Sequence, residues 1–207
     1  MNDDRKAAAG WARQLLNEGT AVVLDTETTG LDTTDEICSI AIIDLTGAVL
    51  LDTLVKPSKP IPPAARSIHH ISDEMVKDAP TFDHVWPKIA DLCAGREIVI
   101  YNASYDVSML ISSRASAGGP YLTDIKTWWD RYSPAEQEIR QMKTTCAMEW
   151  YAQWVGDYSS YHGNYRFQKL PGGDHSALGD CRATLAVIRR MAGIVDPAEQ
   201  APHEATQ

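Results

Sequence analysis

Long apolar runs are absent from this 207-residue sequence. No stretch approaches the roughly 20 consecutive apolar residues that a helix needs to cross a bilayer. The N-terminal segment is charged and lacks the apolar core of a secretion signal. These absences predict a soluble, cytoplasmic protein that does not associate with membranes.

Closely spaced cysteine pairs are also missing. The cysteines are scattered along the chain at Cys38, Cys93, Cys146 and Cys181. Structural zinc sites usually take two cysteines a few residues apart, and disulfide frameworks are typical of much smaller secreted domains. We therefore expect reduced, mostly buried thiols, with no zinc site and no disulfide framework.

Positive charge is scarce as well. The 19 lysines and arginines are outnumbered by 28 acidic residues, which gives a formal net charge of −9. A broad basic surface that grips duplex nucleic acid through many phosphates is therefore not expected. This charge balance does not exclude a nuclease, because two divalent cations held by clustered carboxylates would return about four positive charges where a phosphate must bind.

The domain organisation is simple. No internal repeat is visible, and 207 residues with 44% apolar content fit a single domain. We expect one catalytic domain over residues 1–195 and a disordered tail over 196–207. Within the domain, residues 118–167 form an irregular, aromatic-rich insert.

The apolar pattern predicts an α/β fold. A helix over Ala7–Glu18 is followed by three β-rich runs whose short connections indicate an antiparallel meander. A proline-rich crossing over Lys56–Pro63 then leads to a short helix capped by Ser72. The three β-rich runs are Thr20–Thr26, Glu36–Asp44 and Ala48–Val55.

The second half of the pattern alternates helices with short strands. An apolar-periodic segment, Thr81–Ala94, contains Pro87, which should kink the helix or delay its start. A strand followed by a helix capped by Ser104 indicates a parallel addition to the meander. The remaining expected elements are strands at Glu97–Tyr101 and near Gln141–Thr145, and helices at Ala147–Val155 and Ser176–Met191.

Two carboxylates stand at the end of the first apolar strand, in the segment D-T-E-T-T-G at 25–30. Side chains alternate along a strand, so Asp25 and Glu27 share one face at a separation of about 6.5–7 Å and can reach one metal cluster. An isolated D-x-E is also common at a solvated strand end before a turn, and that interpretation stays open on this segment alone.

Two further acidic positions are ambiguous when taken singly. Asp106 lies in the first turn of a helix, where acidic residues commonly stabilise the helix dipole. Asp180 shares a mainly apolar helix face and needs a partner there. His175 precedes that helix in a glycine-containing loop, and a free imidazole titrates near neutral pH, which suits a general base, although a lone loop histidine is usually just solvated.

Taken together, these segments are far more specific. D-T-E-T-T-G, then N-A-S-Y-D at 102–106, then H-S-A-L-G-D at 175–180 resemble in order and spacing the three motifs of the DEDDh exonucleases. That is the DnaQ-like family, which includes the proofreading subunit of bacterial replicative polymerase. The resemblance extends from about Thr20 to Met191, and residues 118–167 match it poorly.

The resemblance implies an RNase H-like fold, with a mixed five-stranded sheet flanked by helices, and 3′-to-5′ exonuclease activity with two divalent cations, Mg²⁺ or Mn²⁺. Asp25, Glu27 and Asp180 would hold the first cation. Asp25 would bridge to the second, which Asp106 would support through water. His175 would act as the general base.

The resemblance also implies a substrate site. Residues that would bind the terminal nucleotide are Thr28, Thr29, Gly30, His69 and Asn102. His69 matches the histidine of a His-Gly-Ile element of the family. In this chain, His70 stands where that element has glycine. We expect single-stranded DNA as the substrate, with release of nucleoside 5′-monophosphates in proofreading or repair. The motifs do not specify an oligomeric state.

Three alternatives stay open. The same motifs serve exoribonucleases that trim RNA ends or oligoribonucleotides, because the sugar is read by loops outside the motifs. An inactivated scaffold that only binds nucleic acid or protein would have lost one of the five site residues, and all five are present. A metal phosphomonoesterase could also use clustered carboxylates, but it would not need the N-A-S-Y-D and H-S-A-L-G-D context.

The insert and the tail bear on partners. Aromatic residues of the insert could stack on single-stranded bases or dock a protein, but the helical spacing of Trp150, Tyr151 and Trp154 favours packing against the body. The tail lacks a large apolar anchor, so we expect a free-standing or loosely recruited nuclease over a stable polymerase subunit. A polymerase or repair partner stays possible. The insert's aromatic residues are Tyr121, Trp128, Trp129, Tyr132, Trp150, Tyr151, Trp154, Tyr158, Tyr161, Tyr165 and Phe167.

Overall fold

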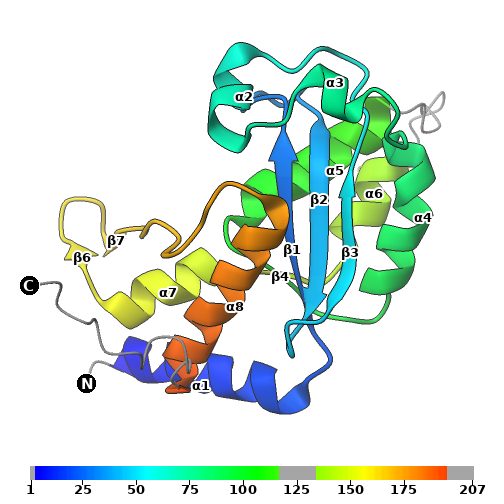
Figure 1. The fold of residues 1–207 in the computed structure, drawn as a ribbon. Helices are drawn as coiled ribbons and strands as arrows, with labels where there is room; N and C mark the ends of the chain where they lie inside the picture. Colours follow the sequence, from blue (N-terminus) through cyan, green and yellow to red (C-terminus); the bar gives the residue numbers. More distant parts are fainter. Residues whose placement is uncertain (1–2, 117–133, 195–207) are drawn as a thin grey trace, which may run out of the picture.

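The computed structural model describes residues 3–116 and 134–194 (Figure 1). Its centre is a five-stranded sheet with the strand order β3-β2-β1-β4-β5. β1, β2 and β3 pair antiparallel, whereas β4 adds parallel to β1 and β5 adds parallel to β4. The predicted mixed sheet of a meander plus parallel strands is therefore confirmed. The strands are β1 (Val22–Thr28), β2 (Ile37–Asp44), β3 (Val49–Leu54), β4 (Ile98–Ile100) and β5 (Thr144–Cys146).

Helices cover both faces of this sheet (Figure 1). Because side chains alternate along β1, Val23 packs into the layer of α1, α7 and α8, and Leu24 packs into the layer of α4 and α5. α6 packs beside α5. The bounds of these helices are α1 (Asp3–Glu18), α4 (Phe82–Cys93), α5 (Ala103–Ser116), α6 (Pro134–Arg140), α7 (Ala147–Val155) and α8 (Ala177–Ala192).

The carboxyl end of β1 lies between two smaller parts of the fold (Figure 1). On one side are α2 (Pro63–His69) and α3 (Asp73–Val76). On the other side the segment that follows a small hairpin, β6 (Tyr158–Ser159) and β7 (Asn164–Tyr165), returns to the N-terminal end of α8. A register shift between Glu27 and Thr28 bends β1 where it ends.

Several element boundaries differ from those that the sequence predicted. α1 begins at Asp3 rather than Ala7. α2 was not predicted. It starts at Pro63, whose fixed φ suits the first helical turn. β5 begins at Thr144, three residues later than expected.

Helix caps and breaks also differ. Ser104 lies inside α5, which begins at Ala103, so its predicted capping role is wrong. Ser72 does occupy the N-cap of α3, although its side chain makes no capping hydrogen bond. Pro87 lies inside α4 and does not delay its start at Phe82.

Within the described part of the aromatic insert, α7 packs against the body, whereas Tyr158, Tyr161 and Phe167 are exposed. The ring of Trp150 stacks on Trp11 of α1 with centroids 5.2 Å apart. Tyr151 is buried, and Trp154 lies under the guanidinium of Arg5. The predicted inward packing of α7 is therefore confirmed. The predicted tail and four aromatic residues of the insert lie outside the described residues: Tyr121, Trp128, Trp129 and Tyr132.

All four cysteines are free, as predicted, and Cys38, Cys93 and Cys181 are buried. In the described part of the chain, no helix has both the length and the apolar character that crossing a membrane requires.

Candidate active site

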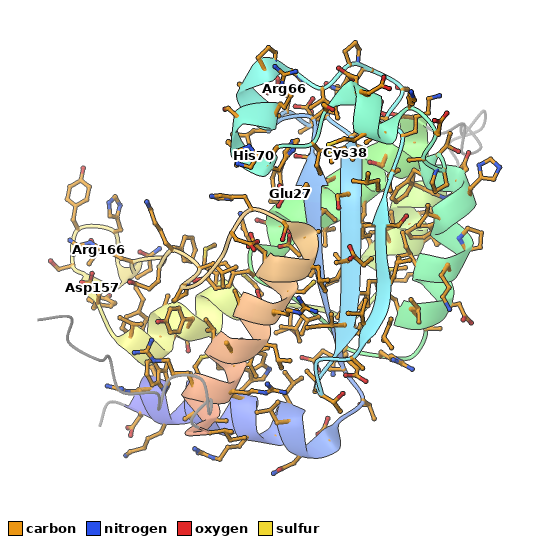
Figure 2. All side chains as sticks on the ribbon, viewed as in Figure 1. Glu27, Cys38, Arg66, His70, Asp157 and Arg166 are labelled. Carbon is orange, nitrogen blue, oxygen red and sulfur yellow. The ribbon has the colours of Figure 1, made fainter. Side chains whose placement is uncertain are left out.

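Asp25 and Glu27 project from β1 on the face of the sheet that α8 covers. Asp25 and Glu27 are separated by one residue and point the same way, as their alternation predicts. Asp180 projects toward them from the first turn of α8. Each of the three offers a carboxylate oxygen, and these oxygens lie within 4.8 Å of one another. Figure 2 shows Glu27 near the end of β1, below α2 with its labelled Arg66 and His70.

Asp180 is held in place by the loop before its own helix. Its Oδ1 accepts hydrogen bonds from the backbone amides of Asp174, at 2.9 Å, and His175, at 3.3 Å. The sequence predicted that Asp180, on an apolar face of α8, needs a hydrogen-bonding partner. That partner is the backbone of the loop before the helix. His175 adopts a left-handed φ of 60°, and its exposed side chain lines the same cavity as Asp180.

The turn into α8 gives structural roles to two further residues of the third motif, Ser176 and Gly179. Ser176 caps the helix, because its side chain accepts a hydrogen bond from the amide of Gly179. The Asp174 carboxylate accepts from both the amide and the hydroxyl of Ser176. A β-carbon on Gly179 would collide with that carboxylate, so a larger residue there would displace the Asp174 side chain.

Asp106 reaches the site from α5, on the opposite face of the sheet. Its side chain is 3% exposed. Thr26, which lies between Asp25 and Glu27 and faces the other way, donates a hydrogen bond of 2.7 Å to Asp106 Oδ1. The motifs assign Thr26 no role, and only its position between the two acidic residues hints at one.

A cavity of about 200 Å³ brings the five predicted site residues together. Asn102 lines it as well. The complete lining is Asp25, Thr26, Glu27, Tyr101, Asn102, Tyr105, Asp106, Leu170, His175 and Asp180.

Burial and mutual repulsion keep protons on this cluster. Burial raises the pKa of Asp25 well above its usual value, and the charges of Asp106, Asp180 and Glu27 add to the shift. Burial, followed by repulsion from Asp180 and Asp106, raises the pKa of Glu27 to about 8. Burial also raises the pKa of Asp106 to about 7, against the lowering effect of the Thr26 hydrogen bond.

This donor set fits divalent cations. The raised pKa values show that the buried site disfavours the full negative charge of its carboxylates, and a bound cation would compensate that charge. Oxygen ligands alone suit hard ions such as Mg²⁺ or Mn²⁺. The geometry and charge of the site therefore match divalent-cation dependence.

A second cavity, of about 510 Å³, adjoins the first and shares Thr26, Glu27 and Tyr105 with it. Four of the five residues predicted to bind the terminal nucleotide line it, namely Thr28, Thr29, Gly30 and His69. Asn102 lies apart from them, in the smaller cavity. Their contact with a nucleotide stays a prediction.

His69 is buried and braces the strand end. Its Nδ1 accepts a hydrogen bond of 3.0 Å from the amide of Ile71, which leaves Nε2 to donate to the carbonyl of Thr28 at 3.2 Å. Burial lowers the pKa of His69, consistent with a neutral ring. His70 ends α2 with a left-handed φ of 61°, which is a conformation that favours glycine.

Two residues to which the motifs assign no role, Tyr105 and Asp35, line the larger cavity. The Tyr105 hydroxyl contacts Thr28 Oγ1 and donates a hydrogen bond of 2.8 Å to the carbonyl of Gly30. Asp35 accepts from Thr29 Oγ1 at 2.9 Å and from the amide of Asp32 at 2.8 Å. Tyr105 precedes Asp106 in its motif, and this was the only sequence signal for either residue.

Comparison with known proteins identifies the family. The model of the family described as Exonuclease (RNase_T) matches residues 22–188. Uncharacterized exonuclease CP81 of Escherichia phage 186 is 37% identical over 186 residues, covering 84% of this chain and 89% of the phage protein. The DNA polymerase III subunit epsilon of Escherichia coli K12 is 34% identical over 100 residues, or 43% of this chain and 41% of that subunit.

Solved structures show the same fold. Exonuclease X in complex with 5′-overhanging duplex DNA has a TM-score of 0.50 and 28% identity, covering 84% of this chain and 93% of that one. E. coli Exonuclease I in complex with a dT13 oligonucleotide has a TM-score of 0.56 over 84% of this chain and 42% of that one, and its 17% identity supports the fold alone. With the acidic cluster of Asp25, Glu27 and Asp180 at the active-site position, these matches show that the chain belongs to the DnaQ-like (RNase T) family and is a DEDD-type 3′-to-5′ exonuclease.

Proposed function

We propose that this exonuclease removes nucleoside 5′-monophosphates from the 3′ end of single-stranded DNA by a two-metal mechanism, in proofreading or repair. The observation that carries the proposal is the acidic cluster itself, with carboxylate oxygens within 4.8 Å of one another next to a cavity of about 510 Å³. A cavity of that volume accommodates one nucleotide. The relative named as DNA polymerase III subunit epsilon and the complex of Exonuclease X with DNA favour DNA over RNA.

Each site residue has a role in this proposal. Asp25, Glu27 and Asp180 would hold one divalent cation, and Asp25 with Asp106 a second. When bound, the cations would offset the carboxylate charge, acidify the attacking water and stabilise the departing 3′ oxygen. His175 would accept a proton from the water. The new phosphorus–oxygen bond forms as the bond to the 3′ oxygen breaks, which leaves a nucleoside 5′-monophosphate and a strand shorter by one residue.

The terminal nucleotide would occupy the larger cavity. Thr28, Thr29 and Gly30 line it, and His69 donates a hydrogen bond to the Thr28 carbonyl. Asn102 would contact the strand on the other side of the acidic cluster.

The test is a cleavage assay on 5′-labelled single-stranded DNA and matched RNA, with Mg²⁺, Mn²⁺ or EDTA, in which products are resolved by length over time. We expect a metal-dependent ladder that shortens from the 3′ end of DNA. The isosteric Asp25→Asn variant should lose the ladder, whereas Asp91→Asn on the exposed side of α4 should keep it. Faster shortening of RNA would reassign the protein as an exoribonuclease, and metal binding without cleavage of either strand would leave a binding module.

A further inference from the structure

An eleven-residue connection, residues 166–176, joins β7 to α8. Only its last two residues, His175 and Ser176, belong to an exonuclease motif. It leaves the β6–β7 hairpin and runs back across α7 to the N-terminal end of α8, beside the end of β1 (Figure 1). Its course therefore joins the outer hairpin to the catalytic cavity.

Tyr101, which follows β4, anchors the first half of this connection. The hydroxyl of Tyr101 donates a hydrogen bond of 2.9 Å to the carbonyl of Gln168. The side chain of Gln168 in turn donates to the carbonyl of Arg166 at 2.9 Å. Leu170 is partly buried, packs against the core and lines the cavity of about 200 Å³. These contacts hold residues 168–170 against the body.

The outward side chains of the same segment have the chemistry of a single-strand binding surface. Phe167 is 61% exposed, although it is a large aromatic residue, and Lys169 is exposed. Lys169 makes no salt bridge with any described residue. The neighbouring Arg166 is already paired with Asp157 at 3.1 Å, and Figure 2 shows both in the hairpin region. An exposed ring and, two residues along the chain, an exposed ammonium without a salt bridge to a described residue offer one base a stacking face and one phosphate a counter-charge.

The two cavities give the direction in which a strand must pass. If the 3′-terminal nucleotide occupies the larger cavity and its phosphate reaches the acidic cluster, the preceding nucleotide leaves the cluster on the side away from the larger cavity. Asn102, Leu170 and His175 line the smaller cavity and not the larger one. Phe167 and Lys169 are exposed residues of the segment that supplies Leu170.

We propose that Phe167 and Lys169 form an upstream subsite that binds the nucleotides preceding the scissile bond of a single-stranded DNA substrate. This inference rests on the proposed function, because it takes the direction of the strand from the placement of the terminal nucleotide. The ring of Phe167 stacks on an upstream base, and Lys169 contacts an upstream phosphate.

The experiment measures kcat/KM of the full chain on two substrates. One is the nitrophenyl ester of thymidine 5′-monophosphate, which has a terminal nucleotide and no upstream nucleotide. The other is a single-stranded DNA octamer. We expect Phe167→Ala to lower the ratio of kcat/KM on the octamer to kcat/KM on the ester at least fivefold, as expected for the loss of one stacked base. Tyr161→Ala is the matched control, because Tyr161 is 90% exposed in the turn between β6 and β7.

Lys169→Gln gives an independent readout. The slope of log kcat/KM on the octamer against log salt concentration should become shallower by about 0.7, the value for one phosphate contact on a single strand. Phe167→Ala should leave that slope unchanged. An unchanged substrate ratio in Phe167→Ala, an equal loss in Tyr161→Ala, or an unchanged slope in Lys169→Gln overturns the subsite. Absence of metal-dependent hydrolysis of both substrates by the unmodified protein would instead overturn the proposed function, and the subsite with it.

Discussion

Thr26 donates a buried hydrogen bond of 2.7 Å to the carboxylate of Asp106, across the sheet from the face that carries Asp25 and Glu27. This bond lowers the pKa of Asp106 against a burial effect that raises it to about 7. The strand that presents two carboxylates to one side thus tunes a third from the other side.

Replacing Thr26 by valine should weaken cation binding without changing the shape of the side chain much. Loss of the donor raises the pKa of Asp106 further, so near neutral pH a larger fraction carries a proton that competes with the cation. We expect the Mg²⁺ concentration for half-maximal activity at pH 7 to rise several-fold. Thr26→Ser, which keeps the hydroxyl, is the control. Equal Mg²⁺ dependence in the valine variant and the unmodified protein would contradict this role.

Removal of Asp25 and of His175 should have different effects. Asp25→Ala should abolish both cation binding, measured by calorimetry with Mn²⁺, and metal-dependent cleavage. His175→Ala should bind Mn²⁺ normally but lose about 10²- to 10⁴-fold in turnover, which is the usual contribution of a general base. Full activity in Asp25→Ala would refute the site assignment.

Without cations, the stability of the protein should fall as pH rises through neutrality. The pKa of Glu27 is about 8 in the folded protein and about 4.5 in an unfolded chain, so between these values the folded state binds more protons than the unfolded state. The free energy of unfolding in EDTA should therefore decrease from about pH 4.5 to pH 8. Saturating Mg²⁺ should offset the decrease.

Glu27→Gln should flatten the same profile, because the amide cannot ionise. Melting temperatures in EDTA between pH 5 and pH 8, measured for both proteins, check this expectation. A steeper fall of the melting temperature with pH in Glu27→Gln than in the unmodified protein would show that Glu27 is not the source of the pH dependence.

Gly30→Ala should disturb the rim of the larger cavity. An added β-carbon would collide with the carboxylate of Asp35, which is pinned by Thr29, by the amide of Asp32 and by a salt bridge to Lys59. Because the carboxylate has little freedom to move away, we expect a loss of about 1–3 kcal/mol in stability and a several-fold higher KM for DNA.

The matched control for that variant is Gly10→Ala. A β-carbon there meets nothing within 4 Å, and the residue lies inside α1. Since alanine is the better helix former, this change should raise the melting temperature slightly and leave KM unchanged. A similar KM increase in both variants would argue against the contact between Gly30 and Asp35.

Sequence periodicity predicted the sheet and most helices because their signals are local. The meander and α7 appear where alternation and helical spacing placed them, whereas Ser104 was assigned to a cap that lies elsewhere. α2 was missed because seven residues with two neighbouring prolines carry too short a pattern to distinguish a helix from a crossing. Boundaries of this kind depend on what the chain packs against.

The sequence by itself determined which groups can do the chemistry. It paired Asp25 with Glu27, because residues two apart on a strand must face the same way. It also placed Asp180 on an apolar helix face, where a carboxylate requires a partner. The order of the three motifs then determined the family.

Only the tertiary structure decided how those groups meet. Thr26 and Asp106 are 80 residues apart in the chain, and their hydrogen bond exists because β4 brings α5 beside β1. The partner of Asp180 proved to be the backbone of its own loop, and Leu170 reached the cavity through an anchor on Tyr101. Such contacts depend on the three-dimensional packing of distant segments, which has no local period for a sequence to display.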